Sequence, residues 1–157
     1  MEESTGRFRR ADRQDVPAIV RLLADDPLGS TRETTDGDQL PDAYWRAFQA
    51  IDADPHQLLM VAEADGQIVG TLQLTFIPSL TYTGGERAQI EGVRVAAGHR
   101  GRGLGRAMVL WAIARARARG CRLVQLTTDR RRPEARRFYA SMGFRPTHVG
   151  MKLSLKK

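Results

Sequence analysis

A glycine-rich turn between a strand pattern and a helix pattern places the strongest constraint on this chain. The turn lies in Val93–Arg106, VRVAAGHRGRGLGR, and has glycines at positions 101, 103 and 105. Glycine lets a backbone approach a ligand closely and adopt conformations that other residues resist. The unpaired N–H groups and the dipole at the start of the following helix attract an anion. Arginines at positions 100, 102 and 106 add full charges, so the segment predicts an anion site.

Two well-known glycine motifs do not match this turn. A Walker-type loop needs Gly-Lys-Ser/Thr, whereas the turn continues Gly103–Arg106, GLGR. The dinucleotide fingerprint needs Gly or Ala three residues after its second glycine, and the two possible frames put Arg106 or Met108 there. The turn also follows three strands that we expect to be antiparallel. A nucleotide triphosphatase and a dinucleotide-binding domain are therefore both disfavoured.

The rest of the chain alternates between strand and helix patterns. Apolar residues at helical spacing predict a helix capped by Asp12, a second beginning at Pro41, a third running from Leu104 to a stop at Gly120, and a fourth at Pro133–Met142. We expect strands at Phe8–Arg10, Leu58–Ala64, Gln67–Phe76, Ala88–Val95, Leu123–Thr127, Phe144–Val149 and Met151–Leu155. This order predicts an α+β fold with a mixed, mostly antiparallel sheet of about six or seven strands flanked by about four helices.

Composition limits the class of protein. The 157 residues suit one domain, 1–157, and no stretch approaches the ~20 apolar residues of a membrane span. One cysteine and three histidines, none spaced as a metal pair, predict a metal-free protein of the reducing cytoplasm. The charge is divided, because residues 1–85 hold 7 arginines and 14 acids, and residues 86–145 hold 15 arginines and 4 acids. That split suits a protein that holds a polyanion on one half, although a solvated surface accounts for most of the arginines.

With these residues in place, the sequence resembles the GNAT superfamily of N-acetyltransferases. Its acetyl-CoA signature, Arg/Gln-x-x-Gly-x-Gly/Ala, is met at positions 100, 103 and 105, and Phe138-Tyr139 and Gly143-Phe144 match its closing helix and turn. The resemblance spans roughly Leu58–Leu155. It departs at Arg132, where the family often has an asparagine that contacts the cofactor arm, and an arginine there could instead meet a CoA phosphate. The cofactor-binding residues that it implies are Val93, Arg94, Val95, Arg100, Gly101, Arg102, Gly103, Leu104, Gly105, Arg106 and Arg132.

The resemblance also implies a general acid for the reaction, whereas the general base has to be inferred from the residues themselves. The family's matching tyrosine faces the thioester sulfur, so Tyr139 is the candidate acid, although a core aromatic is the alternative. Glu91 is the candidate base, since it shares strand parity with Val93 and Val95 unless a bulge shifts the register. A salt bridge to an arginine is an equal interpretation of Glu91, and water could serve as the base. We expect direct transfer in a ternary complex, with the Val93 amide polarising the thioester. His148 is a weaker candidate base, and an acetyl-cysteine route through Cys121 is disfavoured.

The acceptor is the least constrained element. In this fold it is shaped by the loops at Asp25–Leu40 and Pro146–Gly150. The first loop holds five acids, which favour a small cationic amine, although a solvated acidic loop is an equal interpretation: Asp25, Asp26, Glu33, Asp36 and Asp38. Neutralising Asp36 and Asp38 should then raise the KM for the acceptor. A protein lysine or N-terminus is the alternative acceptor. The non-enzyme alternative, an arginine-rich nucleic-acid-binding module, is disfavoured because no such motif is present. Many relatives form dimers, so a homodimer stays open.

Overall fold

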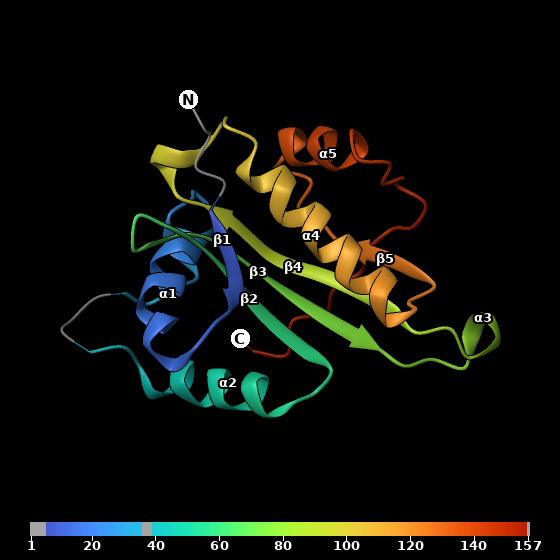
Figure 1. Cartoon of the computed structure of the whole chain (residues 1–157), viewed down its shortest axis with the longest axis horizontal. Helices are drawn as coiled ribbons and strands as arrows, with labels where there is room; N and C mark the ends of the chain where they lie inside the picture. Colours follow the sequence, from blue (N-terminus) through green and yellow to red (C-terminus); the bar gives the residue numbers. More distant parts are fainter. Residues whose placement is uncertain (1–5, 36–38, 157) are drawn as a thin grey trace. The chain divides into compact units, whose positions relative to one another are not determined.

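A computed structural model describes residues 6–35 and 39–156 (Figure 1). The chain divides into two compact units, Met1–Val124 and Gln125–Lys157, and each is described by itself. The strands are β1 (Arg7–Arg10), β2 (Gln57–Ala64), β3 (Gln67–Ile77), β4 (Arg87–Val95) and β5 (Leu123–Leu126). The helices are α1 (Val16–Ala24), α2 (Asp42–Ala53), α3 (Thr81–Gly84), α4 (Leu104–Arg119) and α5 (Pro133–Ala140), and short 3-10 turns are η1 (Arg13–Asp15), η2 (Gly29–Thr31) and η3 (Ala97–His99).

The strands form one sheet in the order β1-β2-β3-β4-β5. The pairs β1/β2, β2/β3 and β3/β4 are antiparallel. Asp65 and Gly66 join β2 to β3 with φ values of 51° and 74°, the left-handed pair that a tight hairpin requires. The predicted α+β class with a mostly antiparallel sheet is therefore confirmed.

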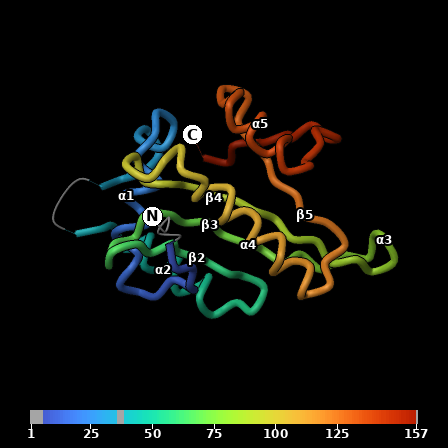
Figure 2. Tube along the Cα trace, turned by 45° about the horizontal axis from the view of Figure 1, so that its top comes forward, coloured from blue at the N-terminus to red at the C-terminus, as the bar shows by residue number. Residues whose placement is uncertain are grey.

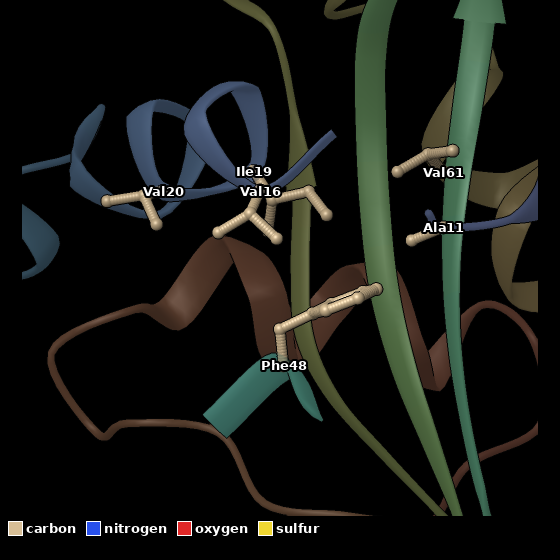
Figure 3. Packing of buried hydrophobic residues seen from close by; sticks show 6 residues of the cluster. All are labelled: Ala11, Val16, Ile19, Val20, Phe48 and Val61. Atoms are coloured by element: carbon tan, nitrogen blue, oxygen red, sulfur yellow. The ribbon is translucent and has the colours of Figure 1, made fainter. Parts of the chain in front are cut away.

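The helices α1 and α2 cover one face of the sheet. Asp12 caps the start of η1, because its side chain accepts from the Gln14 N–H, and Asp15 completes the capping box. Figure 3 shows six members of the buried cluster between these helices and the strands: Val16, Ile19 and Val20 of α1, Phe48 of α2, Val61 of β2, and Ala11, which follows β1. Val61 of β2 pairs with Thr71 of β3, so the side chains in register with these two face α1 and α2.

The helix α4 packs on the opposite face. Its buried residues are Met108, Val109, Ala112 and Ala116, which recur at helical spacing. Gly70 of β3 points toward this helix, since a Cβ there would lie 2.7 Å from the Met108 sulfur. Ala118 is exposed, because the buried stripe runs from Met108 through Ala112 to Ala116.

The two closing strands that the sequence predicts do not form. Residues 144–156 contain no strand, although strands were predicted at Phe144–Val149 and Met151–Leu155. Alternating apolar residues favour a strand, but a strand also needs a hydrogen-bonded partner, and Met151, Leu153 and Leu155 are 86–92% exposed. The sheet consequently has five strands in the described residues. The loop between β3 and β4 contains α3, a four-residue turn with left-handed Tyr82 and Thr83.

Candidate active site

The predicted anion-binding turn connects β4 to α4. Gly101 and Gly103 have φ values of 74° and 83°, so both need the left-handed region that glycine tolerates. A Cβ built at either glycine meets no atom within 4 Å. Gly103 is the N-cap of α4 and supplies no side-chain cap, so no cap side chain covers the N–H groups of the first helical turn. The turn thus combines open space with the positive end of a 16-residue helix.

The arginines of the turn do not all point outward. Arg102 and Arg106 are exposed. The Arg100 side chain instead donates to two carbonyl oxygens, from Nε to Val95 O at 3.0 Å and from a terminal nitrogen to Asp25 O at 3.1 Å. Figure 2 shows the resulting proximity of this turn and the end of α1. Arg100 therefore joins the turn to the segment after α1, whereas Arg102 and Arg106 are free to approach an anion.

A bulge in β4 changes the geometry expected for Glu91. Gln73 of β3 pairs with Glu91, but Thr71, two residues away, pairs with Arg94 instead of Val93. Gly92 takes up the extra residue with a φ of 65°. Glu91 therefore shares a face with Arg94, and the expected parity of Glu91 with Val93 and Val95 is wrong. The role of Glu91 as the base stays a prediction.

Glu91 lies at the end of a row of polar side chains on the α1–α2 face of the sheet. Gln57 Oε1 accepts from Gln73 Nε2 at 2.8 Å and from Thr75 Oγ1 at 2.9 Å. Thr75 Oγ1 is also 3.5 Å from the exposed Glu91 carboxylate. Sequence reasoning missed Gln57, Gln73 and Thr75, although their alternation in the paired strands β2 and β3 was a readable signal. These residues place hydrogen-bonding groups beside the candidate base.

Arg94 lies between Val93 and Val95, and its side chain points to the α1 side of the sheet. Its Nε is 2.8 Å from Asp26 Oδ2, and the two side chains are only 14% and 11% exposed. Its terminal nitrogen donates to the Val93 carbonyl at 2.8 Å. The carbonyls of Val93 and Val95 thus accept hydrogen bonds from Arg94 and Arg100. Their N–H groups are the atoms that we expect to meet a ligand.

The described acids of the loop after α1 bind partners within the protein. Asp26 pairs with Arg94, and Asp25 Oδ2 is 3.7 Å from Arg100. Glu33 accepts from the Tyr44 hydroxyl at 2.7 Å. Burial is the main cause that raises the pKa of Tyr44. Asp36 and Asp38 lie outside the described residues. The attraction of a cationic amine by this loop therefore has weaker support than the number of acids indicated.

A separate ion network holds the start of α1. Arg9 donates to both Asp15 oxygens, at 2.7 and 2.9 Å, and to Glu63 at 2.9 Å. These bonds to Arg9 hold the pKa of Asp15 below its usual value and raise that of Arg9. The network borders an open hollow of about 690 Å³ that also includes Arg21 and Asp25. Of the predicted site residues, only Asp25 lines this hollow.

Tyr139 and Arg132 belong to the second unit. Tyr139 is half-buried on α5 and makes edge-to-face contacts with Phe138 and Phe144, with ring centroids 5.0 and 5.8 Å apart. Gly143 and Phe144 follow the helix end, where the Phe144 N–H donates to the Tyr139 carbonyl at 3.2 Å. Arg132 is half-buried at the N-cap of α5. Beside it, Arg131 binds Asp129 and holds the pKa of that carboxyl well below its usual value.

Two sequence candidates remain, Cys121 and His148. Cys121 is half-buried with its sulfur 3.7 Å from Glu86, and burial raises the pKa of its thiol. Arg119 binds Glu86 and lowers the pKa of that carboxyl. His99 is half-buried and His148 is exposed.

Residues 6–35 and 39–156 hold no group of three His, Cys, Asp or Glu side chains that could bind a metal. None of the helices within those ranges is long and apolar enough to cross a membrane.

Comparison with known proteins bears on the family and the fold. The model of the acetyltransferase (GNAT) family matches residues 17–144. A solved structure named as a transcriptional regulator from Bacillus halodurans C-125 is 48% identical, covers 96% of this chain and 99% of its own, and has a TM-score of 0.93. Glucosamine 6-phosphate N-acetyltransferase of Trypanosoma brucei brucei is 34% identical over 57% of this chain, and streptothricin acetyltransferase of Streptomyces lavendulae is 33% identical over 82%. The matches span 59% and 58% of these two relatives' own lengths.

Proposed function

The chain belongs to the GNAT acetyltransferase family, and from that premise we propose that it transfers an acetyl group from acetyl-CoA to the primary amine of a small molecule. The observation that carries the proposal is the turn Arg100–Gly105, where left-handed glycines and an uncapped helix start leave a site for an anion. Acetyl-CoA supplies an activated acetyl thioester and a pyrophosphate for this turn to hold. The activity belongs to one domain, 1–157, and to the cytoplasm.

The residues of the turn and of β4 have separate tasks in binding. The backbone N–H groups of Gly101–Arg106 hold the pyrophosphate, and Arg102 and Arg106 add charge. The Val93 and Val95 N–H groups bind the acetyl and pantetheine portions. The Val93 N–H stabilises the negative charge that develops on the acetyl oxygen, which is the contribution of an oxyanion hole. The Arg132 side chain contacts a CoA phosphate.

Two side chains move protons in the proposed reaction. An alkyl amine has a pKa near ~10, so most of it is protonated at neutral pH and has no lone pair for attack. Glu91 accepts that proton, directly or through water, and the free amine attacks the acetyl carbon in a ternary complex. The Tyr139 hydroxyl gives its proton to the departing thiolate, and the second proton that the nitrogen loses as the amide forms returns to the tyrosinate through water. The C–N bond forms, the C–S bond breaks, and the products are an N-acetylated amine and free CoA.

A small-molecule acceptor is favoured over a protein acceptor by the names of the relatives. Glucosamine 6-phosphate and streptothricin, which appear in the names of two curated relatives, are small molecules. The polar side chains beside Glu91 suit an acceptor that carries hydrogen-bonding groups near its amine. The acceptor panel should therefore include amino sugars, amino acids, polyamines and lysine peptides.

The test is an acetyl-CoA turnover assay that detects free thiol across that panel. Tyr139→Phe should lower kcat about 100-fold or more, because loss of a general acid costs 10²–10⁴ in rate. Tyr82→Phe is the matched control, since Tyr82 is an exposed tyrosine on α3. Thiol release no faster than hydrolysis with every amine would remove the enzyme proposal.

Because the Bacillus halodurans relative is named a transcriptional regulator, duplex DNA should be titrated in parallel. Tight DNA binding without acetyl-CoA binding would favour the nucleic-acid alternative.

The base has its own test. Glu91→Gln should lower kcat/KM strongly near pH 7 and progressively less as the pH approaches ~10, because the amine then loses its proton without help. A constant ratio of wild type to Glu91→Gln across that range would exclude Glu91 as the base.

A further inference from the structure

The segment after α1 is fastened to β4 by a buried ion pair that the proposed chemistry does not use. Asp26 and Arg94 come 2.8 Å apart from positions 68 residues distant in the chain, and both side chains are largely buried. Asp26 also organises its own segment, because its Oδ1 accepts from the N–H groups of Leu28 and Gly29 at 2.8 and 2.7 Å. One carboxylate thus shapes the turn with one oxygen and binds the strand with the other.

The segment has little room to move without losing these bonds. Gly29 is buried, and a Cβ there would collide with the carbonyl oxygen of Leu23 at the end of α1. Ser30 and Glu33 continue the turn, with backbone donors to Asp26 and Gly29 at 2.9 and 3.0 Å. The pair therefore connects a closely packed turn, rather than a single side chain, to the sheet.

The same segment has a second attachment, at the anion-binding turn. Arg100 donates to the Asp25 carbonyl at 3.1 Å while its Nε binds Val95 O at 3.0 Å. Arg94, in turn, donates to the carbonyl of Val93. The consecutive residues Asp25 and Asp26 are therefore held by two arginines whose side chains also donate to the carbonyls of Val93 and Val95, the residues whose N–H groups are assigned to the acetyl donor.

We propose that Asp26 and Arg94 are positioning residues that hold the segment 25–31 in a set relation to Val93, so that the acceptor amine meets the acetyl donor in the right geometry. This inference rests on the proposed function. Misplacement by about an ångström is enough to lower a rate substantially, and a buried pair between a loop and a strand prevents such misplacement. Neither residue touches the reacting atoms in this scheme.

The clearest variant is Asp26→Asn. The asparagine oxygen can still accept from the Leu28 and Gly29 N–H groups, so the turn keeps its cap while the charge that binds Arg94 is removed. With the best amine of the panel, we expect kcat/KM for the amine to fall at least 10-fold and the Kd for CoA to change less than 3-fold. Arg94→Gln should have the same effect. The double variant should lose less than the two single losses combined, because both changes remove the same pair.

The control is Asp52→Asn, which removes a half-exposed pair with Arg10 at 3.5 Å, remote from β4. It should leave both constants within 2-fold of wild type. If Asp26→Asn raises the Kd for CoA as much as it lowers the amine kcat/KM, or leaves both unchanged, the positioning role is overturned. Strict additivity in the double variant would also overturn it.

Amide hydrogen exchange separates this proposal from the proposed function. Exchange of the amides at 28–31 should be at least 10-fold faster in Asp26→Asn and Arg94→Gln than in wild type and Asp52→Asn. Added CoA should slow these amides in wild type but not in the two pair variants. If no amine is acetylated and CoA does not bind, the proposed function fails, whereas equal exchange in all four proteins overturns the ion-pair role itself.

Discussion

Replacing Gly103 with alanine should weaken CoA binding without unfolding the protein. Gly103 has a φ of 83°, and a left-handed conformation costs a residue with a Cβ roughly 1–2 kcal/mol. Because a Cβ at this position meets no atom within 4 Å, no steric clash adds to that cost. For a domain of this size we expect the midpoint of thermal unfolding to fall by roughly 2–8 °C.

The effect on the ligand should be larger than the effect on the fold. Alanine relieves its strain by moving toward negative φ, which turns the adjoining N–H groups away from the anion. Each charge-assisted hydrogen bond lost removes about 1.5–3 kcal/mol, so the Kd for CoA should rise about 10- to 150-fold. Isothermal titration calorimetry measures this directly, and desulfo-CoA serves as a ligand that cannot turn over.

Gly98→Ala is the matched control for this prediction. Gly98 lies in η3, five residues before Gly103, and a Cβ there also meets nothing within 4 Å. Its φ lies outside the left-handed region, so alanine introduces no strain. The Kd for CoA should stay within 2-fold of wild type. Equal Kd values for Gly103→Ala, Gly98→Ala and wild type would refute the assignment of this turn to the pyrophosphate.

Two further predictions concern stability. Asp15→Asn should lower the free energy of unfolding by about 3 kcal/mol at pH 7, because it breaks the buried ion pair between Asp15 and Arg9. Arg9 keeps its ion pair with Glu63 in this variant. Because the folded pKa of Asp15 lies below its unfolded value near 3.8, this stabilisation is present above about pH 4 and disappears as the pH falls through the folded pKa. Urea unfolding at pH 7 and pH 2.5 should show the gap between variant and wild type closing, and a constant gap would contradict the argument. Gly70→Ala should cost about 1–3 kcal/mol, because its Cβ would lie 2.7 Å from the Met108 sulfur and 3.3 Å from the Arg94 carbonyl. Gly70→Ala should cost less in a Met108→Ala background than in wild type, because the shorter side chain leaves room for the new Cβ. Equal costs in the two backgrounds would mean that the two residues do not compete for space.

The parts of the fold that could be predicted from sequence are those with local causes. The turn at Asp65-Gly66 and the left-handed glycines before α4 follow from which residues tolerate positive φ. The prediction of the two closing strands was wrong because strand formation has a non-local cause. The alternation Met151, Leu153, Leu155 favours a strand locally, but pairing depends on a partner that no local pattern specifies.

The candidate site divides in the same way. Gly92 was a signal for a bulge, because a glycine within a strand often marks one, but the sequence did not establish that the register shifts there. The bulge nevertheless decides that Glu91 and Arg94 share a face. The contact between Asp26 and Arg94 joins residues on different elements, and charge counting alone assigned Asp26 to the acceptor instead of to the strand.

This difference explains why the donor is easier to infer than the acceptor. The proposed donor site is a continuous stretch of backbone, Val93–Arg106, whose N–H groups are arranged by the strand, the glycines and the helix start. The acceptor has no such stretch, because the polar groups around Glu91 come from β2, β3 and β4, and the segment after α1 is held by two arginines on and after β4. Substitutions in that segment could therefore alter acceptor choice while Asp26, Arg94 and Arg100 preserve its attachment. Acceptor specificity should accordingly be sought in exposed side chains of the segment, such as Ser30 and Arg32, whose replacement leaves the ion pair in place.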